Sequence, residues 1–261
     1  MTPDDRPVVV LGAGFFGICA ALRLRSEQPG VEVRIIDPAP EPGGQLRTRR
    51  SAGYSCELGW QGLVADLGEV AWLLARLGLA QRVLPAAIPV PSGLAHAFFG
   101  PPGAATAECT PFTFRSGLEE LVQAARRELA GSFVLGRPIV AVREDAVLLG
   151  GQVPLELSAQ RVVRTADEAA VPVPSLWFGF ERSDAEACLR GAGLERTPGE
   201  DPRILAALYC SNLWPGCTLP GKFLVRIVLT RLEDPEAQAR TVDAWLRART
   251  GLSGRCVFRR I

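Results

Sequence analysis

Three glycines and one carboxylate near the start of the chain have the types and spacing of a nucleotide-binding motif. Gly12, Gly14 and Gly17 follow an apolar run at residues 8–11, and Asp37 ends a second apolar run. Glycines in this pattern permit a tight turn and let a pyrophosphate approach the backbone, while the N-terminus of the following helix adds partial positive charge. A carboxylate about 20 residues beyond the last glycine can accept hydrogen bonds from ribose hydroxyls. The pattern predicts a dinucleotide-binding site.

The elements that must position these residues are a strand, a helix and a second strand. Residues 8–11 are all apolar, which is typical of a strand buried on both faces of a parallel sheet. Ile18, Ala21 and Leu22 give one apolar face to the helix that follows, and residues 31–36 form the second strand. This unit predicts a Rossmann-like fold, but by itself it does not distinguish NAD from FAD.

A second glycine-rich segment follows, with PGGQLRT at residues 42–48 and then GYSCELG at residues 53–59. Here the sequence resembles the FAD-dependent amine oxidase superfamily, whose members carry a second glycine pair, a basic residue and a threonine beside the flavin. The strand expected at residues 137–142 resembles the one whose apolar residue lies near the adenine in these proteins. The resemblance therefore implies FAD as the cofactor. The residues that it implies as FAD-binding are Gly12, Gly14, Phe15, Phe16, Gly17, Asp37, Gly43, Gly44, Gln45, Arg47, Thr48 and Ile139.

The second half of the chain resembles the protoporphyrinogen oxidase branch of this superfamily. The segment PFTFRSGLEELVQAARREL at residues 111–129 is similar to the phenylalanine-rich strand and helix that return the chain to the FAD domain in that branch. Residues 191–231 resemble the antiparallel floor of the substrate domain. Hydrophobic periodicity also predicts a strand at residues 175–180, an amphipathic helix at 234–250 and a last strand at 256–261.

These elements predict an α/β fold with two domains. A Rossmann-like FAD-binding domain with a parallel sheet is joined to a smaller, substrate-type α+β domain with an antiparallel sheet and a helix. The expected boundaries are 1–60 with 111–170 for the FAD-binding domain, 61–110 for a reduced helical and loop insertion, and 171–261 for the substrate-type domain. Within the insertion we expect a helix at residues 66–77 and mostly loop at 85–111, where prolines and glycines concentrate.

The chain departs from the superfamily in length and at one strand. Members are much longer, and most of the missing length falls between Gly59 and Phe112, where they carry a helical substrate-binding lobe. They also continue beyond the position of Ile261 into a strand and helix that contact the flavin, and Arg164 interrupts a strand that is usually apolar. We therefore expect the isolated chain to bind FAD weakly and to oxidise porphyrinogens slowly, and a second chain could complete the flavin site.

The function that the resemblance implies is FAD-dependent oxidation of a porphyrinogen to a porphyrin, as in haem biosynthesis, with hydride transfer from the substrate to the flavin. No catalytic acid or base is nominated, although Glu57 and Asp66 are the carboxylates nearest in sequence to the flavin motifs. One alternative is a non-catalytic or split relic of the family that acts as a partner or binding protein. An NAD-linked dehydrogenase also stays open if Gly43 and Gly44 form a plain turn.

Composition argues against several other classes of function. The 29 basic residues are offset by 28 acidic ones, so the net charge of +1 predicts no nucleic-acid partner. The N-terminus has acidic residues where a secretory signal needs positive charge, and no window approaches roughly 18 consecutive apolar residues. We therefore expect a cytoplasmic protein with no transmembrane segment, which leaves peripheral membrane contact open.

The cysteines and the single histidine give no sign of metal chemistry. The seven cysteines are scattered and form no CxxC pair, which supports neither a disulfide framework nor a zinc site. His96 lies between apolar residues. No metal site is expected, and most of the cysteines are interpreted as small apolar residues.

Overall fold

The computed structural model describes residues 5–64, 68–100, 110–165 and 174–261. The chain forms two compact units, which are Met1–Arg47 with Glu119–Val171 and Thr48–Leu118 with Pro172–Ile261. This grouping differs from the expected boundaries, because residues 48–60 and 111–118 fall in the second unit. Residues 61–110 fall there as well, since their strands pair with the strand that contains Phe112 and Phe114.

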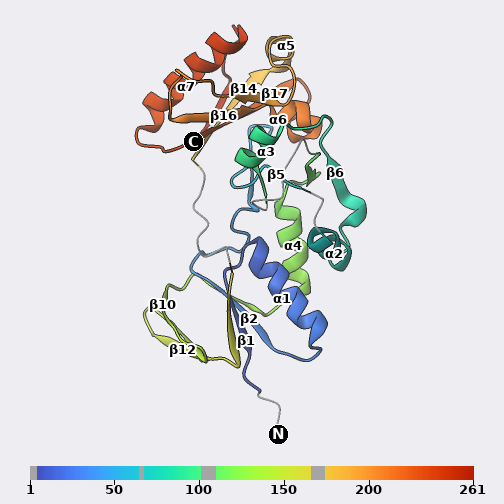
Figure 1. Ribbon diagram of the computed structural model, residues 1–261, viewed down its shortest axis with the longest axis vertical. Coiled ribbons are helices and arrows are strands. Elements are labelled where there is room, and N and C mark those ends of the chain that lie inside the picture. The colour runs from blue at the N-terminus through green and yellow to red at the C-terminus, as the bar shows by residue number, and fades with distance from the viewer. Residues whose placement is uncertain (1–4, 65–67, 101–109, 166–173) are drawn as a thin grey trace. The chain divides into compact units, whose positions relative to one another are not determined.

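The first unit is built on a parallel sheet in the order β13-β1-β2-β9. Its strands are β1 (Val8–Leu11), β2 (Val33–Asp37), β9 (Phe133–Leu135) and β13 (Arg161–Arg164). All residues of β1 are buried, as their uniformly apolar sequence predicts. Helix α1 (Phe15–Glu27) lies along the sheet in Figure 1, with Ile18, Ala21 and Leu22 buried. The predicted strand-helix-strand unit is confirmed.

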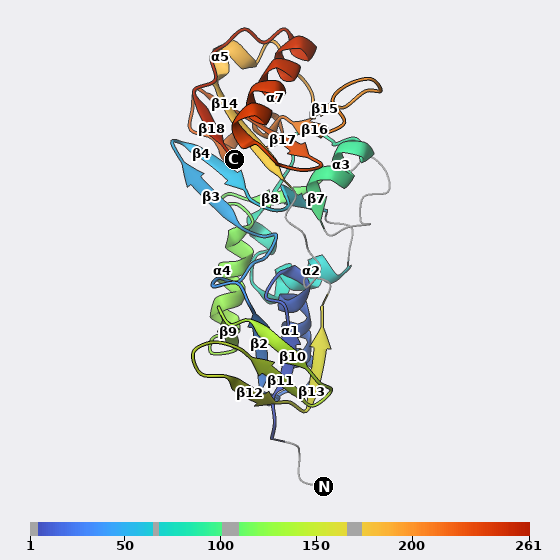
Figure 2. The same ribbon diagram turned by 90° about the vertical axis from the view of Figure 1, so that its left-hand side faces the viewer.

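The first unit also contains a smaller antiparallel sheet and a second helix. The elements are β10 (Ile139–Val142), β11 (Ala146–Leu149), β12 (Leu155–Ser158) and α4 (Glu119–Glu128). Val9 and Leu11 of β1 share a buried cluster with Val147 of β11, and Figure 2 shows β10, β11 and β12 in front of β1 and β2. Because side chains alternate along a strand, Val8 and Val10 face the opposite side of the parallel sheet, where α1 contacts β1.

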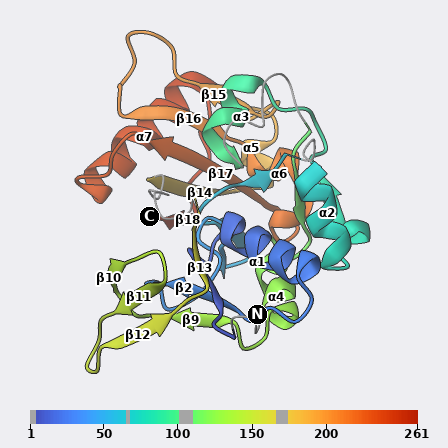
Figure 3. The same ribbon diagram turned by 60° about the horizontal axis from the view of Figure 1, so that its bottom comes forward.

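The second unit is built on an antiparallel sheet in the order β15-β16-β17-β14-β18. Its strands are β14 (Ser175–Glu181), β15 (Gly193–Glu195), β16 (Ile204–Leu208), β17 (Lys222–Leu229) and β18 (Phe258–Arg260). Helix α7 (Pro235–Thr250) packs on one face through Ala239, Val242 and Leu246, and Figure 3 shows it beside β16 and β17. Asp234 caps its first turn by accepting from the Ala237 backbone N–H, and Gly251 ends it with a φ of 72°.

The second unit also contains several shorter elements. They are the strand pair β3 (Thr48–Ser51) and β4 (Tyr54–Glu57), the sheet β6 (Val83–Pro85), β8 (Phe112–Phe114), β5 (Gly62–Leu63) and β7 (Phe99–Gly100), and the helices α2 (Gly68–Arg76), α3 (Ser92–Phe98), α5 (Arg182–Ala185) and α6 (Cys210–Leu213), with short 3-10 helices at Ala80–Arg82 and Pro215–Cys217. Leu94 and Phe98 of α3 join Trp177, Trp214 and Leu224 in one buried cluster. The small elements are therefore part of the core.

Two expectations about this region need correction. The expectation that residues 85–111 are mostly loop is wrong for residues 92–100, which form α3 and β7. Leu94, Ala95 and Phe98 fall on one face of a short helix, and their burial outweighs the local density of proline and glycine. Residues 191–231, which resemble an antiparallel floor, also contain the short helix α6. Asp66 and Cys109 lie outside the described residues, as does the side chain of His96.

Gly179 is placed where no larger residue fits. A Cβ at this position of β14 would lie 2.5 Å from Tyr54 Cζ and 2.8 Å from Phe258 Cβ. The two rings stack with centroids 4.5 Å apart, so neither ring can withdraw without losing its partner. We expect Gly179→Ala to lower the free energy of unfolding by about 1–3 kcal/mol, as overpacked sites do.

Chemical denaturation of the two proteins measures this difference. Gly68→Ala is the control, because nothing lies within 4 Å of a Cβ there and the residue begins a helix. Equal stability of Gly179→Ala and the wild type would show that Tyr54 and Phe258 pack differently.

Candidate functional site

The glycine turn and Asp37 meet at the carboxyl ends of β1 and β2. Gly12 follows β1 with a φ of 97°, and its N–H donates to the Ile36 carbonyl at 2.8 Å. Asp37 Oδ2 accepts from the Ala13 N–H at 2.7 Å, and Oδ1 accepts from the Ala39 N–H at 2.8 Å. The carboxylate is therefore held by both loops, and its remaining lone pairs can accept bonds from a ligand.

The second glycine pair is in backbone contact with the first turn. The Gly43 N–H donates to the Ala13 carbonyl at 2.8 Å, and a Cβ at Gly44 would lie 3.2 Å from Gly14 Cα. Both residues have positive φ, 123° and 51°, which favours glycine. Gly43 and Gly44 therefore belong to the same local structure as the nucleotide motif, and they are not an isolated turn.

Helix α1 presents its N-terminal end to this turn. Its N-cap is Gly14, which makes no side-chain capping bond, and its first turn contains no acidic residue. The partial positive charge of a helix N-terminus is therefore not neutralised by a side chain of the helix, which favours a bound anion such as a pyrophosphate.

A cavity of about 300 Å³ opens beside these residues in the first unit. It is lined by Leu11, Gly12, Asp37, Pro38, Ile139, Val142 and Arg164. The structure thus brings Ile139, which the resemblance implies near an adenine, to the same cavity as Gly12 and Asp37. It also places Arg164 there, at the carboxyl end of β13, which pairs with Leu11 of β1.

The other residues that are expected to bind FAD lie in different surroundings. The Phe15 and Phe16 rings meet edge to face with centroids 5.4 Å apart, and Gln45 is half-buried. Arg47 is exposed, and its Nε donates to the Gly44 carbonyl at 3.2 Å, so it folds back on the glycine pair. Thr48 belongs to the second unit, where it is buried against Glu57. The place of Thr48 beside the flavin therefore stays a prediction.

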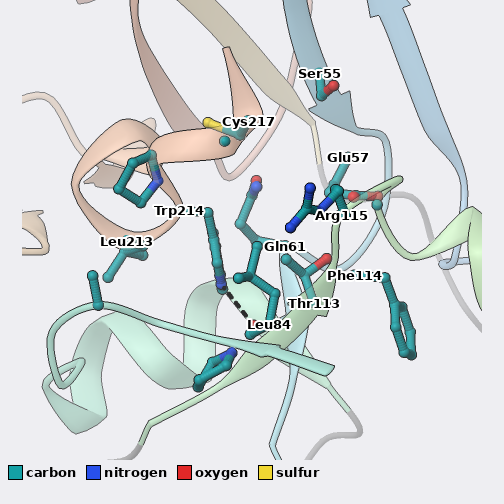
Figure 4. A pocket seen from close by; sticks show the side chains of 15 residues that line it. Ser55, Glu57, Gln61, Leu84, Thr113, Phe114, Arg115, Leu213, Trp214 and Cys217 are labelled. Atoms are coloured by element: carbon teal, nitrogen blue, oxygen red, sulfur yellow. Dashed lines mark hydrogen bonds between the residues drawn. The ribbon is translucent and has the colours of Figure 1, made fainter. Parts of the chain in front are cut away.

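The second unit contains a larger cavity of about 570 Å³. Its walls are Ser55, Glu57, Gln61, Leu84, Pro85, Ala87, Thr113, Phe114, Arg115, Gly117, Leu213, Trp214, Pro215, Gly216 and Cys217, most of which appear in Figure 4. A few polar groups among mostly apolar side chains are typical of small-molecule sites of this size. Sequence reasoning missed this cavity, because its walls come from segments far apart in the chain.

Glu57 is the buried acid of this cavity. Its Oε2 accepts from Thr48 Oγ1 at 2.8 Å and its Oε1 from the Leu118 N–H at 3.0 Å. Burial raises the pKa of Glu57 to about 7, and the hydrogen bonds from Leu118 and Thr48 oppose this rise without cancelling it. A Cβ at Gly117 would collide with Thr48 Oγ1 and Glu57 Oε1, so this position requires glycine.

Residues 10–80 match a family described as NAD(P)-binding Rossmann-like domain. A coproporphyrinogen III oxidase of Staphylococcus aureus is 29% identical over 79 residues, which cover 30% of this chain and 17% of that protein. A coproporphyrinogen III oxidase of Mycobacterium leprae is 38% identical over 79 residues, which cover 30% of this chain and 18% of that protein. The match thus spans less than a fifth of these relatives' length.

A solved structure extends the likeness to the whole fold. A proposed protoporphyrinogen oxidase from Exiguobacterium sp. 255-15 superimposes with a TM-score of 0.76, covering 98% of this chain and 86% of that chain at 12% identity. The resemblance to the FAD-dependent amine oxidase superfamily is confirmed. The predicted fold class, a Rossmann-like parallel-sheet domain with an antiparallel second domain, is confirmed as well. At 12% identity the likeness to that structure concerns the fold alone.

Across the helices of the described ranges, none is long and apolar enough to cross a membrane. In the same part of the chain, no group of histidine, cysteine, aspartate and glutamate side chains is arranged to hold a metal ion.

The raised pKa of Glu57 makes the stability of the protein depend on pH. The folded state holds the proton more tightly than an unfolded chain with a carboxyl pKa of 4.5, so the stabilisation is complete below pH 4.5 and is lost as the pH rises to about 7. The shift corresponds to roughly 3 kcal/mol. We expect Glu57→Gln to remove this dependence, so that the variant gains stability relative to the wild type between these pH values.

Urea denaturation of both proteins across this pH range checks the expectation. Glu144→Gln, which removes an exposed carboxylate, is the matched control. A constant difference between Glu57→Gln and the wild type at every pH would mean that Glu57 does not titrate with a raised pKa.

Proposed function

We propose that the protein is an FAD-dependent oxidoreductase of the protoporphyrinogen oxidase type, which oxidises a porphyrinogen to a porphyrin. The observation that carries the proposal is the contact between the two glycine motifs beside Asp37. The Gly43 N–H donates to the Ala13 carbonyl, and Ala13 in turn donates to Asp37. A backbone cradle, a helix N-terminus and a carboxylate are thereby assembled around one small space.

The features of this space fit an FAD better than a ligand of another class. Gly12 and Gly44 both have positive φ, and Gly44 approaches Gly14 too closely for a Cβ without displacement. In the resembling superfamily, the second glycine pair and a basic residue accompany FAD. The contact of Arg47 Nε with the Gly44 carbonyl supports the same role for these residues here.

Each part of the first unit then has a role toward the cofactor. Gly12, Gly14 and the N-terminal end of α1 would hold the pyrophosphate, and Asp37 would accept bonds from the ribose. Ile139 would contact the adenine in the cavity that it shares with Asp37. FAD, when bound, supplies a hydride acceptor, and the chain supplies binding and orientation.

The porphyrinogen is proposed from the named relatives. Coproporphyrinogen III oxidases match 30% of this chain, and their names give the substrate class. The apolar walls of the cavity in the second unit, including Leu84, Phe114 and Trp214, are compatible with a large apolar molecule.

The direct test is to purify the chain, add FAD and measure flavin fluorescence quenching and the absorbance of bound flavin. Porphyrin fluorescence after addition of freshly reduced coproporphyrinogen III then reports the reaction. The proposal expects FAD binding and porphyrin formation above the rate of autoxidation. Tight NADH binding without FAD binding would favour a nicotinamide-linked enzyme, and FAD binding without turnover would favour the non-catalytic alternative.

Asp37→Asn tests the ribose contact. The substitution keeps one acceptor oxygen and turns the other into an NH2 donor, so the Ala13 or the Ala39 N–H loses its acceptor and a ribose hydroxyl loses one of its acceptors. We expect the affinity for FAD to fall by about 1–3 kcal/mol. Fluorescence titration measures this change, and Asp145→Asn, at an exposed position of the same unit, is the control. Unchanged affinity would remove Asp37 from the site.

Gly44→Ala tests the contact between the glycine motifs. The new Cβ would lie 3.2 Å from Gly14 Cα, which is backbone and can yield only by moving the pyrophosphate turn. We expect the affinity for FAD to fall by about 1–3 kcal/mol. Gly30→Ala is the control, because that glycine also has a positive φ but nothing lies within 4 Å of a Cβ there. If both variants bind FAD equally, the second glycine pair does not shape the site.

A further inference from the structure

The cavity of the second unit contains a charged side chain, Arg115, that has no ion-pair partner among the described residues. Arg115 lines the cavity and is exposed, and Figure 4 shows its guanidinium directed toward the middle of the lining side chains. Within the described part of the chain, this guanidinium forms neither a hydrogen bond nor an ion pair. An unpaired guanidinium presents several N–H donors in a plane that suits a carboxylate.

A second donor in the cavity is the amide nitrogen of Gln61, which is oriented by the buried Arg226. Arg226 of β17 is 1% exposed and donates to Gln61 Oε1 at 3.3 Å and to Ser175 Oγ at 3.0 Å. A guanidinium has no acceptor, so the oxygen of the Gln61 amide must face Arg226 and the nitrogen must point away from it. Among the described residues, Gln61 Nε2 has no hydrogen-bond partner. Gln61 therefore offers an N–H donor to the cavity.

A third polar group lacks a partner on the same wall. Thr113 is 6% exposed, and its Oγ1 is buried without a hydrogen-bond partner among the described residues. Leaving such a group unpaired is unfavourable, so a ligand that bonds to it recovers free energy. Thr113 and Arg115 lie on and just after β8, which brings the hydroxyl and the guanidinium to one edge of the cavity.

The charges around the cavity favour an anion. Arg226 is placed between the rings of Phe98 and Trp177, at 5.7 and 5.2 Å from their centroids, and has no carboxylate partner within the described ranges. Burial lowers the pKa of Arg226 to about 10, so the group stays charged near neutral pH. The cavity is also lined by Glu57, whose two oxygens already accept from Thr48 and Leu118.

We propose that this cavity binds an apolar carboxylic acid, with the carboxylate on Arg115 and Gln61 and the apolar body against Leu84, Phe114 and Trp214. Arg115 then determines specificity by selecting acids over neutral molecules of the same shape. Arg226 is a positioning residue, because it acts through Gln61. The cavity receives the carboxylate of a porphyrinogen only if the proposed function holds, whereas its affinity for apolar acids depends on these side chains alone.

The test compares an acid with its ester. Full-length protein free of FAD is titrated with coproporphyrin III and with fully methyl-esterified coproporphyrin III, and quenching of tryptophan fluorescence reports binding near Trp214. We expect the acid to bind the wild type more tightly than the ester. Arg115→Gln should lower the affinity for the acid roughly 10- to 100-fold, as expected for loss of a charge-assisted contact, and leave the ester unchanged.

Three variants complete the experiment. Arg115→Lys should recover part of the affinity, because it keeps the charge but not the planar donors. Gln61→Glu should also lower the affinity for the acid and not for the ester. The substitution replaces the donor with a negative charge and gives Arg226 a carboxylate partner. Arg196→Gln, at an exposed arginine away from the cavity, should bind both porphyrins as the wild type does.

Equal binding of acid and ester by the wild type, no binding of either, or unchanged acid binding in Arg115→Gln would each overturn this proposal. Repeating the titrations with saturating FAD separates it from the proposed function. Acid binding that depends on Arg115 in a protein that does not bind FAD would refute only the flavin proposal. FAD binding with no effect of Arg115 would refute only the acid site.

Discussion

The first unit depends on the hydrogen bond from the Ala13 backbone N–H to the Asp37 carboxylate. This bond, 2.7 Å long, joins the turn after β1 to the last residue of β2. Because Asp37 also accepts from Ala39, one side chain fixes the loops that leave both central strands. The second glycine pair then attaches to the same turn through the Ala13 carbonyl. The position of the glycine cradle, the start of α1 and the adjoining cavity all follow from this arrangement.

Sequence reasoning succeeded where the determining interactions are local. An apolar strand, a glycine turn and an amphipathic helix in direct succession specify a strand-helix-strand unit, since each element is defined by its own residues and their immediate neighbours. The same holds for α7, whose Asp234 cap and terminal Gly251 are readable in the sequence. Ile139 could be associated with Asp37 only through the resemblance, because nothing in the spacing relates residues so far apart.

Sequence reasoning falls short where tertiary contacts decide the outcome. The resemblance places Thr48 beside the flavin, which stays a prediction, but the spacing of the residues does not reveal that the Thr48 hydroxyl donates to the buried Glu57 carboxyl group. Residues 92–98 read as loop by composition, but burial of Leu94 and Phe98 stabilises a helix there. The larger cavity could not be predicted for a related reason. Its walls come from four separate segments, residues 55–61, 84–87, 113–117 and 213–217, which meet only in the folded chain.

The way the chain passes between the two units bears on how it folds during synthesis. The units are Met1–Arg47 with Glu119–Val171 and Thr48–Leu118 with Pro172–Ile261, so neither is a single continuous segment. A ribosome releases the whole first unit once residue 171 has emerged. By then residues 48–118 have already left the ribosome. The residues that form the antiparallel sheet, which buries Leu94, are still being translated. During that interval, apolar side chains such as Phe98 and Phe99 lack the sheet residues that later bury them, which exposes this segment of the nascent chain to aggregation and to chaperones.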